Sequence, residues 1–184
     1  MIVLAGKTCS GKNLVASKLS ELGYRQIITY TTRPKREDEI QDEAYHFITE
    51  DDFKNKISED FFAEYKTYDT QFGTWYYGTS LADIENAENK SIVILTPQGY
   101  RDVKNKLLNK DITTIYLCAD ENTLKSRLLQ RGDNPKEAER RLKQDREDFN
   151  GFEDEADILV YNNADLSIET VINTIKEALQ YIYE

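Results

Sequence analysis

Two glycines and a lysine near residue 10 have the spacing of a loop that binds phosphate. Residues 6–13 read Gly-Lys-Thr-Cys-Ser-Gly-Lys-Asn, which contains the G-x-x-x-x-G-K pattern. In such a loop the glycines let the backbone wrap around a phosphate, while main-chain N–H groups and the dipole of the following helix attract its oxygens. The lysine adds a compact positive charge for the outer phosphates of a nucleotide. We call residues 6–13 the phosphate loop; the alternative is an ordinary glycine-rich turn.

The last residue of the phosphate loop departs from the usual pattern. Most such loops carry Ser or Thr after the lysine, and its hydroxyl coordinates Mg²⁺, whereas this chain has Asn13. Because an amide oxygen also ligates a hard cation, Asn13 is the candidate ligand for Mg²⁺. The candidate nucleotide-binding residues of the loop are Gly6, Lys7, Thr8, Cys9, Ser10, Gly11, Lys12 and Asn13.

The arginines are concentrated in two parts of the chain. Five of the nine lie between residues 127 and 146, and Arg33 and Arg36 form a second group. Because arginine binds phosphate oxygens in a bidentate way, both groups are candidates for contact with an anion. The alternative for residues 120–150 is a solvated helix surface with ion pairs, since eight acidic and eight basic side chains occur there together.

The composition limits the possible partners. With 34 acidic and 24 basic residues among 184, the chain has a formal charge of −10, which disfavours non-specific binding to nucleic acid or to an anionic membrane. No apolar run exceeds five residues, the first residues lack the basic start of a signal peptide, and two cysteines are too few for a disulfide scaffold. We therefore expect one soluble, cytoplasmic domain.

Apolar patterns along the chain alternate between strands and helices. This alternation indicates an α/β fold, with a parallel sheet flanked by helices. The clearest helical spacing covers residues 168–182, after a candidate N-cap at Ser167. The short apolar runs suit strands buried on both faces, and they lie at residues 2–5, 26–30, 92–95, 114–118 and 158–161.

Two further segments have a different character. Residues 33–77 are rich in aromatic side chains, and their pattern predicts a small α+β insertion with short strands around one helix that begins near Glu50. Residues 131–150 are highly charged with helical spacing, and they predict a helical lid.

Beyond the phosphate loop, several separated motifs occur in a fixed order. Residues 31–39 read TTRPKREDE and are followed by Tyr-His-Phe at 45–47, FAEY at 62–65 and YYGTS at 76–80. Arg-Leu at 127–128, Arg-Gly at 131–132 and Arg-Leu at 141–142 come later. In this order the motifs resemble the guanylate kinase family, and the resemblance extends over essentially the whole chain.

The resemblance implies a fold and an activity. The fold would be a single domain, 1–184, with a P-loop NTPase-type parallel sheet flanked by helices. Its core would be 1–32, 78–130 and 151–184, with a monophosphate-binding α+β insertion at about 33–77 and a helical lid at about 131–150. The activity would be transfer of the γ-phosphoryl group of ATP to GMP or dGMP, with Mg²⁺ as cofactor and small-molecule nucleotides as partners.

The resemblance also implies roles for individual residues. Around the transferred group it places the catalytic residues Lys12, Arg33, Arg131 and Arg141. Near ATP it places Arg127 and Asn162. It assigns the phosphate of the monophosphate to Thr29, Arg33, Arg36, Tyr45 and Tyr77, with Glu39 supporting the arginines. It assigns the base to Glu64, Thr79, Ser80 and Thr96.

Two departures from the family pattern keep other functions open. The family usually has D-x-D-x-Q-G after its central strand, whereas residues 94–99 here read ILTPQG. Thr96 in place of an acid favours a kinase for a different monophosphate, and about four residues are inserted around Asp69 to Gly73. The other alternative is a non-catalytic phosphopeptide-binding module, which is expected to lose the phosphate loop and the lid arginines that this chain retains.

Overall fold

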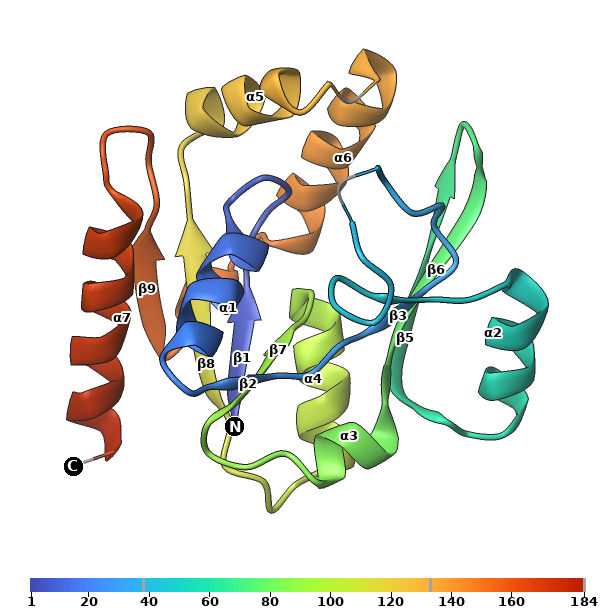
Figure 1. Cartoon of the computed structure of the whole chain (residues 1–184), viewed down its shortest axis with the longest axis horizontal. Helices are drawn as coiled ribbons and strands as arrows, with labels where there is room; N and C mark the ends of the chain where they lie inside the picture. The colour runs from blue at the N-terminus through green and yellow to red at the C-terminus, as the bar shows by residue number, and fades with distance from the viewer. Residues whose placement is uncertain (38, 133, 184) are drawn as a thin grey trace.

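The computed structural model describes residues 1–37, 39–132 and 134–183. Its larger sheet has five strands, all parallel, in the order β2-β7-β1-β8-β9 (Figure 1). These strands are β1 (Ile2–Ala5), β2 (Arg25–Gln26), β7 (Ser91–Ile94), β8 (Thr113–Cys118) and β9 (Ile158–Tyr161). The predicted α/β fold class with a parallel sheet is confirmed.

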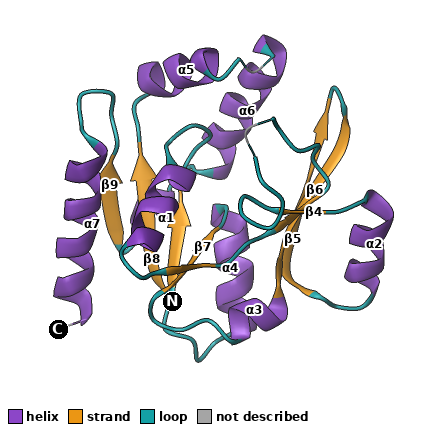
Figure 2. Ribbon diagram, in the orientation of Figure 1, coloured by secondary structure: helices purple, strands orange, loops and turns teal. Residues whose placement is uncertain are grey.

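Helices pack on both faces of this sheet (Figure 2). In β1, Ile2 and Leu4 belong to the buried cluster formed with α1 (Lys12–Glu21) and α7 (Ile168–Tyr183). The alternate residues Val3 and Ala5 belong to the cluster formed with α3 (Leu81–Glu85) and α4 (Pro97–Lys106). Because both faces are buried, the strand reads as a continuous apolar run.

A smaller sheet is formed by the middle of the chain, beside the helix α2 (Glu50–Ser58). Its order is β4-β3-β6-β5, with β5 and β6 paired as an antiparallel hairpin. The predicted α+β segment with one helix is thus observed. Its strands are β3 (Tyr30–Thr31), β4 (His46–Phe47), β5 (Phe62–Thr70) and β6 (Gly73–Ser80).

The prediction of one strand over residues 26–30 is wrong. Residues 25–26 form β2 and pair with β7, whereas residues 30–31 form β3 and pair with β6. The run is apolar for two separate reasons. Ile27 is buried in the core under the larger sheet, and Tyr30 packs edge-on against Phe61 in the smaller one. The chain therefore crosses from one sheet to the other within this run.

Two helices form the upper part of the molecule in Figure 1, α5 (Glu121–Gln130) and α6 (Pro135–Asp148). Asn134 caps α6, because its Oδ1 accepts from the N–H of Lys136 at 3.0 Å. At the other end Phe149 stacks on Tyr116 with 5.3 Å between ring centroids, which ties the end of the helix to β8. In the described part of the chain, no helix has the length and apolarity needed to cross a membrane.

Phe152 lies in the short helix η1 (Phe152–Asp154), and its side chain is completely buried. Its ring contacts Tyr100, Tyr116 and Phe149, with centroids 5.5–5.9 Å apart. We predict that Phe152→Ala lowers the free energy of unfolding by about 3–5 kcal/mol, because a buried ring is replaced by a cavity. Urea denaturation measures the change. Phe72→Ala, at a side chain that is 62% exposed, should change it by less than about 1 kcal/mol; equal losses would contradict the prediction.

Candidate active site

The phosphate loop leaves the carboxyl end of β1 and runs directly into α1. Its backbone requires glycine at two positions. Gly11 has a φ of 99°, and a Cβ there would lie 2.4 Å from Nδ2 of Asn162. A Cβ on Gly6 would lie 2.8 Å from the carbonyl oxygen of Leu117. The spacing of the two glycines therefore reflects a close approach of the loop to β8 and to the residues after β9.

Two side chains from distant parts of the sequence support the back of the loop. The amide of the buried Asn162 donates to the carbonyl of Ser10 at 2.8 Å. Arg127 Nη1 lies 3.3 Å from the carbonyl of Cys9 and 3.4 Å from that of Ser10 and donates to both. These contacts hold the carbonyls of Cys9 and Ser10 toward Arg127 and Asn162.

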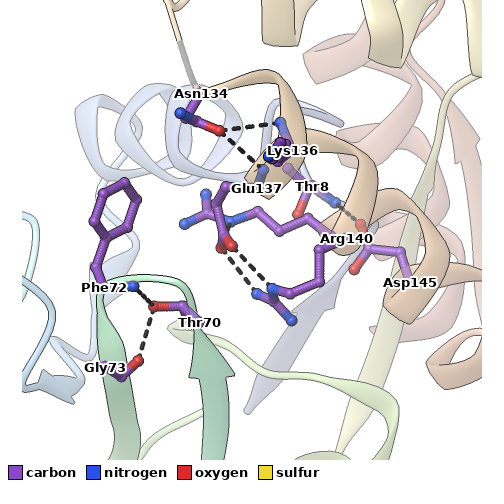
Figure 3. A network of polar contacts seen from close by, with 10 residues as sticks. Thr8, Thr70, Phe72, Gly73, Asn134, Lys136, Glu137, Arg140 and Asp145 are labelled. Atoms are coloured by element: carbon purple, nitrogen blue, oxygen red, sulfur yellow. Dashed lines mark hydrogen bonds and ion pairs between the residues drawn. The ribbon is translucent and has the colours of Figure 1, made fainter.

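On the phosphate side, two groups of the loop are engaged by the protein itself. Lys12 Nζ donates to the carbonyls of Gly6 at 2.6 Å and Lys7 at 2.9 Å. Burial lowers the pKa of Lys12, and the attraction of Asp145 opposes that effect. The N–H of Thr8 donates to Oδ2 of Asp145, on α6, at 2.6 Å (Figure 3).

A cavity of about 340 Å³ extends from the phosphate loop to the smaller sheet and α6. Among the described residues that line it are seven cationic side chains and two carboxylates, Glu64 and Asp145. In a chain with a formal charge of −10, this concentration of positive charge fits the binding of a polyanion. The seven cationic residues are Lys12, Arg33, Arg36, Lys66, Arg131, Arg140 and Arg141.

Arg33 and Arg36 are held by one carboxylate. Arg33 is only 5% exposed, and its Nη2 donates to Oε1 of Glu39 at 2.6 Å. Arg36 donates to the same carboxylate through its backbone N–H at 2.8 Å and its Nη1 at 3.3 Å. Burial by itself would raise the pKa of Glu39, but these hydrogen bonds and charges outweigh it and lower the pKa. Glu39 itself lies behind the arginines.

Tyr45 and Tyr77 line the cavity beside Arg33, as does Thr29. The rings of the two tyrosines are 6.0 Å apart, and the guanidinium of Arg33 lies 5.5 Å from the centre of the Tyr45 ring. Burial raises the pKa of Tyr45 to about 12. Its hydroxyl is therefore a neutral hydrogen-bond donor at physiological pH.

Glu64, on β5, also lines the cavity, where it contacts β6 and lies beside α4. The hydroxyl of Thr79 donates to its Oε1 at 2.6 Å. Burial raises the pKa of Glu64 to about 7, and the hydrogen bond from Thr79 opposes this only in part. A Cβ on Gly99 would lie 2.8 Å from its Oε2, so Gly99 leaves room for the carboxylate. Thr96 caps α4, because its Oγ1 accepts from the N–H of Gly99 at 3.1 Å.

The arginines of α6 are held in the same way as Arg33 and Arg36. Glu137 is buried on α6, and its carboxylate accepts two hydrogen bonds from Arg140 and one from Nε of Arg141, each at 2.9 Å. Figure 3 shows Glu137 and Arg140 side by side below the cap residue Asn134. Burial would raise the pKa of Glu137, but the two arginines lower it.

Contacts across the cavity join the β5–β6 hairpin to α6. Lys66 Nζ and Oδ2 of Asp148 form an ion pair at 2.5 Å. Arg140 lies over the ring of Tyr68, at 5.9 Å, and Arg141 over that of Trp75, at 5.6 Å. We call these three pairs the cross-cavity contacts.

Sequence reasoning missed several residues of this cavity. Lys66 and Tyr68 share a face of β5 with Glu64, because side chains alternate along a strand, so the period of two could have revealed them. The missed lining residues are Lys66, Tyr68, Trp75, Arg140, Gln144 and Asp145, and Glu137, which holds Arg140 and Arg141 from behind, was missed as well.

The structure gathers most of the predicted site residues around the cavity, but not all of them. Ser80 instead caps α3, with its Oγ accepting from the N–H of Asp83 at 3.3 Å, and Ser10 is buried within the loop. The predicted residues that line the cavity are Gly6, Thr8, Cys9, Gly11, Lys12, Asn13, Thr29, Arg33, Arg36, Tyr45, Glu64, Tyr77, Thr79, Thr96, Arg131 and Arg141.

A phosphate loop at the end of a central parallel strand, beside a cationic cavity lined by α6, defines the class of P-loop phosphotransferases. Comparison with known proteins identifies the family. The family model described as guanylate kinase matches residues 1–182, and the chain belongs to the guanylate kinase family. It is a nucleoside monophosphate kinase, a transferase.

Individual relatives agree with this assignment. The chain is 33% identical to the guanylate kinase of Sulfurimonas denitrificans over 172 residues, which cover 89% of this chain and 80% of the relative. It is also 33% identical to the guanylate kinase of Hydrogenovibrio crunogenus over 170 residues, with the same coverage. A crystal structure of guanylate kinase from Anaplasma phagocytophilum has the same fold, with a TM-score of 0.70 at 21% identity over 99% of this chain and 85% of that one.

The buried pair of Arg33 and Glu39 generates a stability prediction. The pKa of Glu39 is lowered on folding. Its contribution to the free energy of unfolding is therefore fully present above the unfolded pKa of about 4, and it is lost as the pH falls through the folded pKa. Glu39→Gln should therefore lower the free energy of unfolding by about 3 kcal/mol at pH 7, and by progressively less below pH 4. Urea denaturation from pH 3 to 8 measures this. Glu43→Gln, at an exposed position nearby, is the control; equal losses in both variants would contradict the prediction.

Proposed function

We propose that the cavity binds ATP and GMP or dGMP together, with the triphosphate on the phosphate loop and the guanine at Glu64. The chain transfers the γ-phosphoryl group of ATP to the monophosphate, giving ADP and GDP or dGDP. The observation that carries this assignment of sites is the cavity itself, which is lined by seven cationic side chains, the phosphate loop and the carboxylate of Glu64.

The donor phosphates would be held by the N–H groups of the phosphate loop and by Lys12. A phosphate oxygen would attract Lys12 Nζ away from the neutral carbonyls of Gly6 and Lys7, since a charged acceptor makes the stronger hydrogen bond. Arg131 and Arg141 line the cavity on the lid side, where they would neutralise charge on the transferred group. Arg127 and Asn162 contribute indirectly by supporting the back of the loop.

The acceptor phosphate would bind between Arg33, Arg36 and the two tyrosines. Two guanidinium groups and neutral hydroxyl donors suit a phosphate with two negative charges. Glu39 fixes both arginines and leaves them facing the cavity, and Glu137 does the same for Arg141 on the lid. Glu137 is therefore a positioning residue in this proposal.

The guanine would be recognised by Glu64. An ionised carboxylate accepts hydrogen bonds from the N1–H and amino group of guanine, while the hydroxyl of Thr79 is close enough to serve the same base edge. Ile94 and Thr96 also line this end of the cavity. Because Ile94 is apolar and the Thr96 hydroxyl accepts from Gly99, discrimination against adenine would depend mainly on Glu64.

Catalysis would consist of positioning and charge neutralisation, since phosphoryl transfer needs no covalent protein nucleophile. The cations on both sides of the cavity would bring the two anionic substrates together in line. The lid helix α6 and the hairpin would exclude water, which otherwise competes with GMP as the acceptor.

The donor set next to the loop fits Mg²⁺. Among the described residues, no group of three or more His, Cys, Asp or Glu side chains could hold a metal. Mg²⁺ needs no such cage, because it keeps several waters and binds substrate phosphates with one or two protein ligands. The amide oxygen of Asn13, which lines the cavity beside Lys12, would be that protein ligand. Bound Mg²⁺ would supply charge neutralisation at the β- and γ-phosphates.

A coupled assay of ADP release tests the proposed function. We expect kcat/KM to be highest with GMP and dGMP, and lower with AMP, CMP and UMP. Lys12→Ala should reduce turnover by about 100-fold or more, as loss of a preorganised electrostatic group does. Lys18→Ala, on the exposed side of α1 where its partner is Glu21, should leave turnover unchanged. Equal kcat/KM for GMP and AMP would refute the guanine assignment.

The raised pKa of Glu64 predicts a pH dependence of GMP binding. Because only the ionised carboxylate accepts both guanine hydrogens, the dissociation constant of GMP should fall about tenfold between pH 6 and pH 8, as the group ionises with a pKa of about 7. In Glu64→Gln this part of the dependence should disappear and leave only the titration of the GMP phosphate near pH 6. Calorimetry measures both. Ribose 5-phosphate is the control ligand, and the same pH profile for both proteins would contradict the role of Glu64.

A further inference from the structure

The contact between Asp145 and Thr8 places a carboxylate where the phosphate loop binds anions. Oδ2 of Asp145 accepts from the backbone N–H of Thr8 at 2.6 Å, as Figure 3 shows. A charged acceptor on a backbone N–H makes a hydrogen bond of about twice the strength of a neutral one. The two residues are 137 positions apart in the sequence, so only the docking of α6 brings them together.

Asp145 shares the cavity with the cationic group of the phosphate loop. Thr8 and Lys12 both line the cavity, and Asp145 lines it with them. The carboxylate therefore accepts from a main-chain N–H that a phosphate would bind, in the same cavity as the lysine.

The helix that carries Asp145 is fixed near this point. Phe149, one turn later, stacks on Tyr116 of β8, and Asp148 pairs with Lys66 of β5. An anion that replaces Asp145 as the acceptor of the Thr8 N–H would therefore displace the Asp145 side chain rather than the end of α6. The displaced carboxylate remains close to the loop, where it repels a triphosphate.

We propose that Asp145 is an internal competitor of the nucleotide phosphates and sets the affinity of the phosphate loop for its donor. This inference rests on the proposed function of the loop as the ATP site. The apparent dissociation constant is the intrinsic one divided by the fraction of molecules in which the loop is accessible. A carboxylate that occupies the N–H of Thr8 nine-tenths of the time thus weakens binding about tenfold. The same competition assists the release of ADP.

The test compares phosphate affinity in variants that differ by one charge. Asp145→Asn keeps the size of the side chain and an acceptor for Thr8 but removes the charge, and Asp145→Ala removes both. The matched control is Glu147→Gln, which removes the same charge from an exposed position on the same helix. Dissociation constants of inorganic pyrophosphate, ADP and adenosine are measured by calorimetry at constant ionic strength, in EDTA to exclude metal. Thermal unfolding checks the fold of each variant.

We expect pyrophosphate and ADP to bind about tenfold more tightly to Asp145→Ala, with an intermediate gain for Asp145→Asn and a change below twofold for Glu147→Gln. Adenosine, which lacks phosphate, should bind all four proteins alike. Unchanged or weaker pyrophosphate binding in both Asp145 variants would overturn the proposal, since Asp145 would then order the loop rather than compete. A gain equal to that of Glu147→Gln would also overturn it. The proposed function fails separately, if the unmodified protein binds neither ATP nor ADP.

Discussion

Mutual repulsion of the cations is the constraint around which this site is built. Seven cationic side chains line one cavity, and like charges at such distances repel each other unless carboxylates compensate them. Each of these carboxylates pairs with one or two of the cations. Glu39 serves Arg33 and Arg36, Glu137 serves Arg140 and Arg141, and Asp148 serves Lys66. Asp145 acts on Lys12.

The position of each carboxylate determines its effect on function. Glu39 and Glu137 lie behind their arginines, so that the guanidinium groups stay oriented toward the cavity and available to a phosphate. Asp145 lies in front, on the N–H group of the loop itself. Carboxylates of the first kind favour anion binding because they order the arginine side chains before the anion binds, which lowers the entropy cost of binding. A carboxylate of the second kind would compete with an anion for the N–H group, as we propose for Asp145.

The two sheets bring these groups together from opposite sides. The carboxyl end of the larger parallel sheet holds the phosphate loop, as expected for a ligand at the switch point of an open α/β sheet. The β5–β6 hairpin of the smaller sheet carries Glu64 and Lys66 on one face, and its pairing places Thr79 beside Glu64. The cross-cavity contacts then link this hairpin to α6, so that the smaller sheet and the helix share one set of interactions.

The sequence alone determined the features that depend on local spacing. The phosphate loop, four strands of the parallel sheet and the Ser167 cap of α7 were predictable, because a turn, an apolar run or a cap involves residues close in the chain. The family motifs also predicted Arg33 and Glu64, which line one cavity, and Glu39, which pairs with Arg33. The division of residues 26–30 between β2 and β3 was not predictable. Ile27 is buried under the larger sheet and Tyr30 packs in the smaller one, and both give the same apolar pattern in the sequence.

Tertiary structure alone decided which charges meet. Asp145 and Asp148 look like ordinary members of a charged helix in the sequence, yet they reach Thr8 and Lys66, which are 137 and 82 positions away. Likewise the family pattern predicts that Arg127 and Asn162 lie near the nucleotide, and only the structure shows that they also support the back of the loop. A charge pattern indicates only that a side chain lies in solvent or has a polar partner, and it does not identify that partner. The docking of α6 on the core, through Phe149 and Tyr116, selects that partner.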